Sequence, residues 1–324
     1  MFLATAAAAS TTQTLDPSQF IGIPFALVGA VLMSVGAQMQ HAGVGKVEAN
    51  TGSESKSALN LKQIMALMGR PSWLFGTMFL GLAVVFQLVS LGFSPIMVVQ
   101  PIGAVALVIT AILNSRVSKV KLNKLSILAI TLCVGGIGVF VTVAAFTARN
   151  EPVLEEDLVQ ILITLGFVML IFAALYLFWM RKRPVALFYI VGAGVLYGFV
   201  ATLAKVVEAR LLQNDMDTLL WICLAALLLA AIIGGLFVQN AYSNGPPDLV
   251  IAGLTVIDPL VAVCIGIVIL DEAAQSPAWA VVVYVLTALA AVAGVILLSL
   301  VHPQANGETG EIAEIKRGSS GLAS

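Results

Sequence analysis

The chain alternates between long apolar stretches and short polar connections. Nine of the stretches are close to the ~20 residues that a helix needs to cross the hydrocarbon core of a bilayer. The pattern predicts membrane-spanning helices at residues 20–41, 72–92, 94–113, 125–147, 158–180, 185–206, 219–238, 249–270 and 278–301. The rest of the chain would form an N-terminal extramembrane segment at 1–19, an acidic linker at 149–157 and a polar, disordered tail at 302–324.

The longest connection between two predicted helices covers residues 43–70. It holds a polar stretch and then a short amphipathic piece at 59–69, which is too short to span a bilayer alone. We expect this piece to be interfacial or re-entrant. The sequence leaves open whether it forms a tenth membrane element.

Composition supports a membrane protein. The chain is 60% hydrophobic and 10% charged, with a mean hydropathy of +1.04, whereas soluble domains carry about 25% charged residues. The net charge of -1 says little about partners, and the sequence has no basic patch that would suggest nucleic acid. Cys133, Cys223 and Cys264 each lie in an apolar stretch and are interpreted as small core residues rather than disulfide partners or metal ligands.

Lysine and arginine are unevenly distributed over the connections. If nine helices alternate in direction, 13 of the 16 basic residues fall on one side of the membrane. The side with the excess of positive charge is cytoplasmic by the positive-inside rule. The N-terminus is therefore predicted outside and the C-terminus in the cytoplasm, and the alanine-rich, disulfide-free chain fits a bacterial inner membrane.

Two parts of the chain follow a similar order of features. Residues 94–141 and 245–297 each contain an apolar helix with a polar–proline pair, Gln100–Pro101 in one and Asp258–Pro259 in the other. With nine helices, the two copies cross the membrane in opposite directions. The sequence thus predicts an all-α polytopic membrane protein with two inverted-topology halves, four helices at 20–148 and five at 158–301.

Asp258 is the most informative residue, because it lies near the middle of a predicted span. An ionisable group at that depth is costly unless it lines a cavity or has a partner. Proline removes one backbone donor, so helix breaks are expected at Pro101 and Pro259, and a broken helix with a buried acid is typical of a transporter's binding site. Asp258 could bind a cation, a coupling proton or a cationic substrate group; the alternative is a structural bond to a neighbouring helix.

Other polar residues of the predicted helices are candidate substrate or ion ligands: Lys205, Gln100, Gln87, Gln38, His41 and Tyr197. Lys205 could contact an anionic group or pair with Asp258, while snorkelling and a pair with Glu208 are the alternatives. Gln87 and Gln100 could bind substrate or simply join helices. Gln38 and His41 share a helical face at the end of a span, where polar residues are also ordinary.

Three glycines and one acidic pair complete the candidates. Tyr197 lies within the series Gly192, Gly194 and Gly198, which is interpreted as close helix packing, and packing is also the favoured role for Tyr197. Asp271–Glu272 follows the span at 249–270. This pair could gate the path or attract cations, and a solvated helix end is an equally good interpretation.

The order of these motifs resembles the drug/metabolite transporter superfamily with its EamA-type repeats. The matching residues are the run from Gln38 to Gly43, Trp73 with Gly76 and Gln87, Ser94–Pro95 with Gln100–Pro101, Gly198 with Lys205, Asp258–Pro259, Asp271–Glu272 and Gly294. The first half is similar to the NIPA-type branch, which implies magnesium transport. Superfamily members usually have ten helices, and often a glutamate near the position of Lys119, two points at which this chain differs.

The leading hypothesis is a secondary transporter that moves a small solute by alternating access, coupled to protons or another ion. Asp258 would sense charge, and Lys205 and Gln100 would line the path. The sequence has no P-loop motif, which argues against ATP as the direct energy source. A NIPA-like carrier of Mg²⁺ or another divalent cation is the alternative, with Asp258 as the metal ligand.

A non-transporting membrane scaffold is the alternative from another class. An enzyme is not expected, because the predicted spans contain no cluster of acid–base residues. No cofactor is expected either, and Mg²⁺ would enter as substrate. The expected partners are the bilayer and the transported solute, and the sequence leaves a homodimer open.

Overall fold

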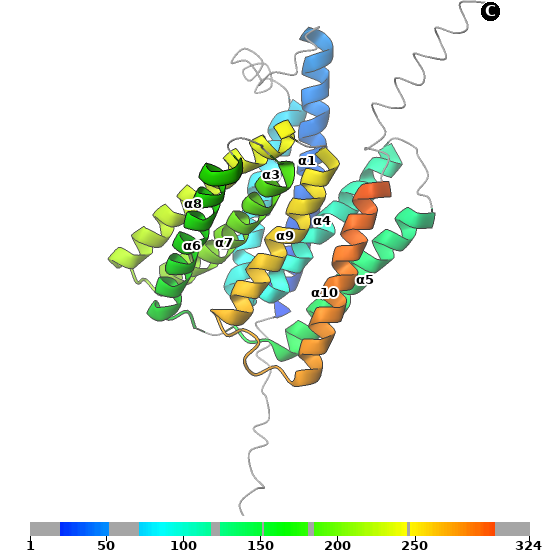
Figure 1. Cartoon of the computed structure of the whole chain (residues 1–324). Coiled ribbons are helices and arrows are strands. Elements are labelled where there is room, and N and C mark those ends of the chain that lie inside the picture. The colour runs from blue at the N-terminus through cyan, green and yellow to red at the C-terminus, as the bar shows by residue number, and fades with distance from the viewer. Residues whose placement is uncertain are drawn as a thin grey trace, which may run out of the picture.

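The computed structural model describes residues 20–51, 71–117, 124–150, 152–180, 185–244 and 247–301. In this part of the chain, nine helices are long and apolar enough to cross a membrane (Figure 1), which confirms the all-α class and the nine predicted spans. The helices are α1 (Gly22–Thr51), α3 (Pro71–Phe93), α4 (Ile96–Val117), α5 (Lys124–Thr147), α6 (Glu155–Leu175), α7 (Ala186–Leu212), α8 (Thr218–Asn244), α9 (Pro247–Val268) and α10 (Ala278–Val301). A π-helical turn, η2 (Tyr176–Met180), extends α6. The predictions for 1–19, 59–69 and 302–324 fall outside the described residues.

The helices carry apolar side chains on their outer faces as well as between them. On α6, Ile163, Phe167 and Leu170 are each more than 60% exposed. An apolar outer surface suits contact with lipid. Helices suit the hydrocarbon core as well, because it offers no water to the backbone and a helix satisfies its own N–H and C=O groups. The protein is therefore an integral membrane protein whose core lies between the helices.

Close helix contacts occur at glycines. Between α1 and α3, a Cβ on Gly36 would lie 2.9 Å from the carbonyl oxygen of Gly76. Between α7 and α9, a Cβ on Gly194 would lie 2.7 Å from the side chain of Ile257, and one on Gly198 2.7 Å from that of Val261. Small residues let helix backbones approach closely in a membrane, which confirms the packing role predicted for Gly194 and Gly198.

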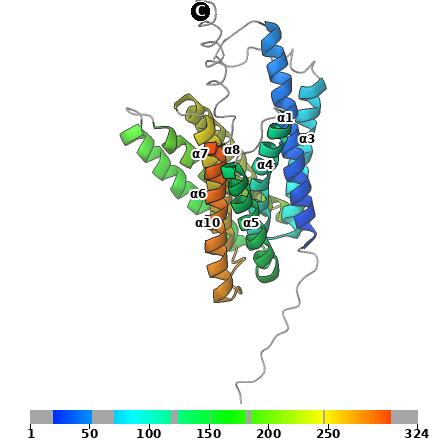
Figure 2. The same cartoon turned by 90° about the vertical axis from the view of Figure 1, so that its right-hand side faces the viewer.

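The helices pack in a regular set of pairs. α1 contacts α3 and α4, and α7 contacts α8 and α9. Between these groups, α4 packs against α9. α5 packs along α10, as both views show (Figures 1 and 2). α6 contacts α7 and α8 at the edge of the bundle.

The predicted helix breaks at Pro101 and Pro259 are not found. α4 continues through Pro101, and α9 continues through Pro259. The fixed φ of proline is compatible with a helix, and membrane helices tolerate the missing donor because their surroundings re-satisfy the freed groups. By helix geometry, the carbonyls that lose their helical donor are those of Met97 and Thr255.

Candidate functional site

Asp258 lies at the middle of α9, where this helix crosses α7. A Cβ on Gly198 would be 3.0 Å from the carbonyl oxygen of Asp258, and one on Gly194 would be 3.4 Å from its amide nitrogen. The Oδ1 atom of Asp258 is buried and has no hydrogen-bond partner among the described residues. A buried acceptor without a partner carries its full desolvation cost, so this oxygen is well suited to take a cation, a proton or a water molecule.

Tyr197 of α7 directly precedes Gly198, the glycine that packs against the backbone of Asp258. Its ring packs on α8, with one ring carbon 3.1 Å from the position that a Cβ would take on Gly234. Its hydroxyl also points to α8, 3.9 Å from the position that a Cβ would take on Gly235. Tyr197 thus has the packing role expected for it, and no hydrogen bond joins it to Asp258 in the described structure.

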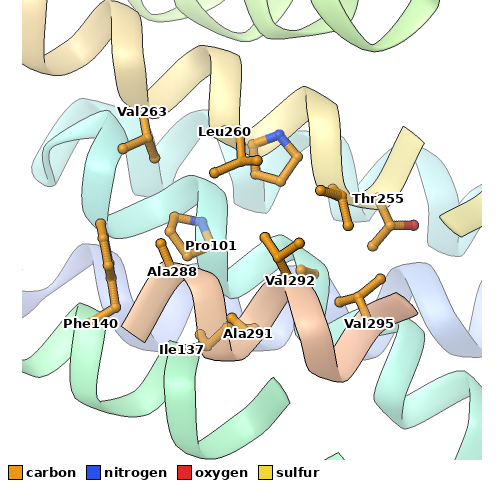
Figure 3. A pocket seen from close by; sticks show the side chains of 13 residues that line it. Pro101, Ile137, Phe140, Thr255, Leu260, Val263, Ala288, Ala291, Val292 and Val295 are labelled. Atoms are coloured by element: carbon orange, nitrogen blue, oxygen red, sulfur yellow. The ribbon is translucent and has the colours of Figure 1, made fainter. Parts of the chain in front are cut away.

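An apolar cleft lies between α4, α5, α9 and α10 (Figure 3). It encloses about 500 Å³ of empty space, including the part open to the surroundings. Both prolines line it, together with Ala104, Ile137, Phe140, Thr255, Val256, Leu260, Val263, Ala288, Ala291, Val292 and Val295. The Thr255 hydroxyl is already used, since it donates to the carbonyl of Ile251 at 2.7 Å. Asp258 does not line this cleft. The face of α9 that lines the cleft is mostly apolar, and Asp258 belongs to another part of the helix.

Lys205 pairs with Glu272, and neither Asp258 nor Glu208 is its hydrogen-bonded partner. Lys205 Nζ lies 2.7 Å from Glu272 Oε1, and the two side chains are only 5% and 1% exposed. The alternatives predicted for Lys205 are therefore wrong for this structure, because the ammonium neither snorkels outward nor bonds the acid one turn along α7. A basic residue inside a span needs an acid partner, and here the loop after α9 supplies it.

Glu272 also binds the first turn of α4. The backbone N–H groups of Ile96 and Met97 donate to Oε1 and Oε2 at 2.7 and 2.9 Å. The first N–H groups of a helix have no helical acceptor, and a carboxylate suits the positive end of the helix dipole. Gly266 leaves room for this carboxylate, because a Cβ there would lie 2.8 Å from Oε2.

The acidic pair therefore splits into two environments. Glu272 is 2% exposed, so the prediction of a solvated helix end is wrong for this residue. Asp271 is exposed and has a left-handed backbone with φ of 52°. The sequence gives one signal for such an acid, because Lys205 lies inside a predicted span where its charge requires a partner, but this signal does not distinguish Glu272 from other acids.

A second cavity, which we call the vestibule, lies at the Glu272 end of the bundle. It encloses about 660 Å³, including space open to the surroundings. Its lining comprises Leu91, Gly92, Asn150, Pro152, Val153, Lys205, Ala209, Leu212 and Gln213. Glu208 lies beside it, since a Cβ on Gly92 would be 2.7 Å from Glu208 Oε1. Lys205 thus contacts both the vestibule and Glu272.

The remaining predicted residues are less closely connected to Asp258. Gln100 is buried in α4, one turn beyond Ile96, and Gln87 and Gln38 are half-buried in α3 and α1. No hydrogen bond joins any of the three to Asp258 in the described structure. His41 belongs to α1, but its side chain is outside the described residues; nearby, Gln40 donates to the Thr77 hydroxyl at 2.9 Å.

The described residues contain no group of three His, Cys, Asp or Glu side chains that could hold a metal ion. A divalent cation bound among the described residues would therefore have at most two such side chains as ligands. Mg²⁺ fits such a site, because it keeps several of its waters and is commonly bound through one or two carboxylates.

Comparison with known proteins gives one family. A family model described as magnesium transporter NIPA matches residues 17–304. An uncharacterized protein of Corynebacterium glutamicum is 25% identical over 267 residues, which cover 81% of this chain and 89% of that protein. No solved structure matches the chain significantly.

Proposed function

Since the chain belongs to the magnesium transporter NIPA family, we propose that it carries Mg²⁺ across the membrane with Asp258 as the residue that binds the ion. Membership in this branch of the drug/metabolite transporter superfamily confirms the resemblance carried by the motifs. The family is one of membrane transporters and not of enzymes. The observation that carries the proposal is the buried, unpartnered Oδ1 of Asp258 at mid-membrane.

The charges of the membrane interior favour a cation at Asp258. Lys205 is neutralised by Glu272 at 2.7 Å, so it does not supply a counter-charge to Asp258. A partly hydrated Mg²⁺ would keep most of its waters and meet the carboxylate directly or through one of them.

We further propose that α1, α3, α4 and α5 form one half and α7, α8, α9 and α10 an inverted second half, with α6 as the connection. The packing supports this assignment, because α1 contacts α3 and α4 just as α7 contacts α8 and α9. The contacts of α4 with α9 and of α5 with α10 would then lie on the pseudo-two-fold axis. Inverted repeats allow alternating access around a site near the midplane.

A small amphipathic solute is the second candidate substrate. The cleft beside Pro101 and Pro259 favours it, since ligand pockets for organic molecules are mostly apolar with few polar groups. Such a solute would be the transported substrate in place of Mg²⁺. Both would use a proton or ion gradient for coupling, with Asp258 as the group that exchanges its proton.

Binding to the purified protein tests the proposal. We expect Mg²⁺ at about 100 times its Kd to stabilise the wild type by roughly 2.7 kcal/mol, which raises the melting temperature by several degrees. Asp258→Asn should abolish this shift, because an amide offers no net charge to the ion. Asp271→Asn, which neutralises an exposed acid, is the matched control and should keep the shift. Equal stabilisation of the wild type and Asp258→Asn would contradict the assignment, and a shift caused only by an organic solute would favour the second candidate.

A further inference from the structure

We propose that Lys205, Glu272 and the first turn of α4 form a gate that closes the transport path at the Glu272 end of the bundle. The gate opens when Lys205 and α4 separate from Glu272. This inference rests on the proposed function, since only a transporter needs such a gate. The three parts come from separate elements, joined by a 2.7 Å ion pair and by two hydrogen bonds from backbone amides of α4 to the Glu272 carboxylate.

The ion pair lies between the vestibule and the acid at mid-membrane. On one side, Lys205 lines the vestibule. On the other side, one turn along α7, Thr202 is fully buried and donates to the carbonyl of Gly198 at 3.0 Å. Gly198 in turn packs against the backbone of Asp258. A solute that moves along α7 from the vestibule to Asp258 must therefore pass Lys205 and Glu272.

Glu272 is the fixed part of this gate. Its carbonyl accepts from the amide of Arg149 at 2.9 Å, and its amide donates to the carbonyl of Gly266 at 3.0 Å. A few residues on, the Ser276 hydroxyl donates to the carbonyl of Thr147 at 3.1 Å. The loop is thus bound to the ends of α5 and α9, whereas the hydrogen bonds from Lys205 and α4 go to the side chain of Glu272.

A buried ion pair suits a gate because its closed and open states are close in free energy. Two charges lose hydration when they are buried, and their attraction repays this cost only in part. Separation on the vestibule side would rehydrate both groups. It would also release the first turn of α4, the helix that carries Gln100 and Pro101, so that opening the gate changes the surroundings of the central site.

Chemical labelling tests the gate without reference to the transported solute. In the full chain with Cys133, Cys223 and Cys264 replaced by serine, Thr202→Cys places a thiol just behind the ion pair. A membrane-impermeant methanethiosulfonate is applied to right-side-out and to inverted vesicles, so that both membrane faces are sampled. We expect slow labelling from the vestibule side with the gate intact, and at least a ten-fold faster rate with Lys205→Met or Glu272→Gln.

Two further variants sharpen the result. Asp271→Asn, next to Glu272 but exposed, should leave the rate unchanged. The exchanged pair Lys205→Glu with Glu272→Lys should still label fast, because a lysine at position 272 cannot accept from the amides of Ile96 and Met97. If a single variant does not fold, the labelling rate of the double variant Lys205→Met with Glu272→Gln is the test, since this variant buries no charge at either position.

The proposal is overturned by an unchanged rate in the gate variants, by equal acceleration in Asp271→Asn, or by a slow rate restored in the exchanged pair. Its failure is distinguishable from failure of the proposed function. If the gate variants accelerate labelling in a protein that does not transport Mg²⁺, the gate proposal is supported and Mg²⁺ is rejected as the substrate.

Discussion

Gly294→Leu is expected to prevent stable assembly of the helix bundle. A Cβ at this position would lie 2.4 Å from the backbone nitrogen of Cys133 and 2.8 Å from the carbonyl oxygen of Ala129. Both atoms belong to the backbone of α5 and cannot rotate away as a side chain would. Overpacking typically costs about 1–3 kcal/mol and occasionally more; with α5 and α10 forced apart along their contact, we expect a cost of at least ~3 kcal/mol. The melting temperature and the monodisperse fraction in detergent measure this loss.

The same α5 helix offers the control. Gly135 and Gly138 are exposed, and a Cβ on either meets nothing within 4 Å. Gly138→Leu should therefore keep the melting temperature of the wild type, whereas Gly136→Leu should behave like Gly294→Leu. If Gly138→Leu were as damaging as Gly294→Leu, helix propensity or lipid contact would explain the loss, and the α5–α10 contact would not.

The second large effect concerns the stability supplied by Lys205 and Glu272. Removal of one partner of a buried pair typically costs 3–5 kcal/mol, because it leaves the other charge buried and unpaired. We expect about this cost, 3–5 kcal/mol, for Lys205→Met. Lys205→Met combined with Glu272→Gln should be more stable than the sum of the single variants implies, by roughly 1–3 kcal/mol. Unfolding free energies of the four proteins of this cycle provide the measurement, and additive losses would show that the two side chains are not coupled.

The sequence predicts the membrane architecture well because the bilayer imposes it. A span must be about 20 residues long and apolar, and this requirement identified all nine helices. The glycines at 194 and 198 were recognisable for a similar reason, since close helix contacts in lipid select small residues. Burial of the Asp258 carboxylate also followed from its depth in the span.

The partner of Lys205 could not be found in the same way. Glu272 lies 67 positions further along the chain, in a loop where an acidic pair is as easily solvated as buried. Only the fold decides which of two adjacent carboxylates turns inward, and here Gly266 and the amides of α4 receive Glu272. The helix breaks predicted at Pro101 and Pro259 are absent because the surroundings of a membrane helix compensate for the donor that proline lacks, which the local sequence does not reveal.

Mg²⁺ flux into proteoliposomes tests the central claim most directly. Purified protein is reconstituted around an entrapped Mg²⁺-sensitive dye, and external Mg²⁺ is added to the wild type, Asp258→Asn, Asp271→Asn and protein-free vesicles. We expect uptake with the wild type and Asp271→Asn, and at least a ten-fold slower rate with Asp258→Asn. A wild-type rate no higher than that of protein-free vesicles would contradict Mg²⁺ transport, and an undiminished rate in Asp258→Asn would contradict the role of this carboxylate.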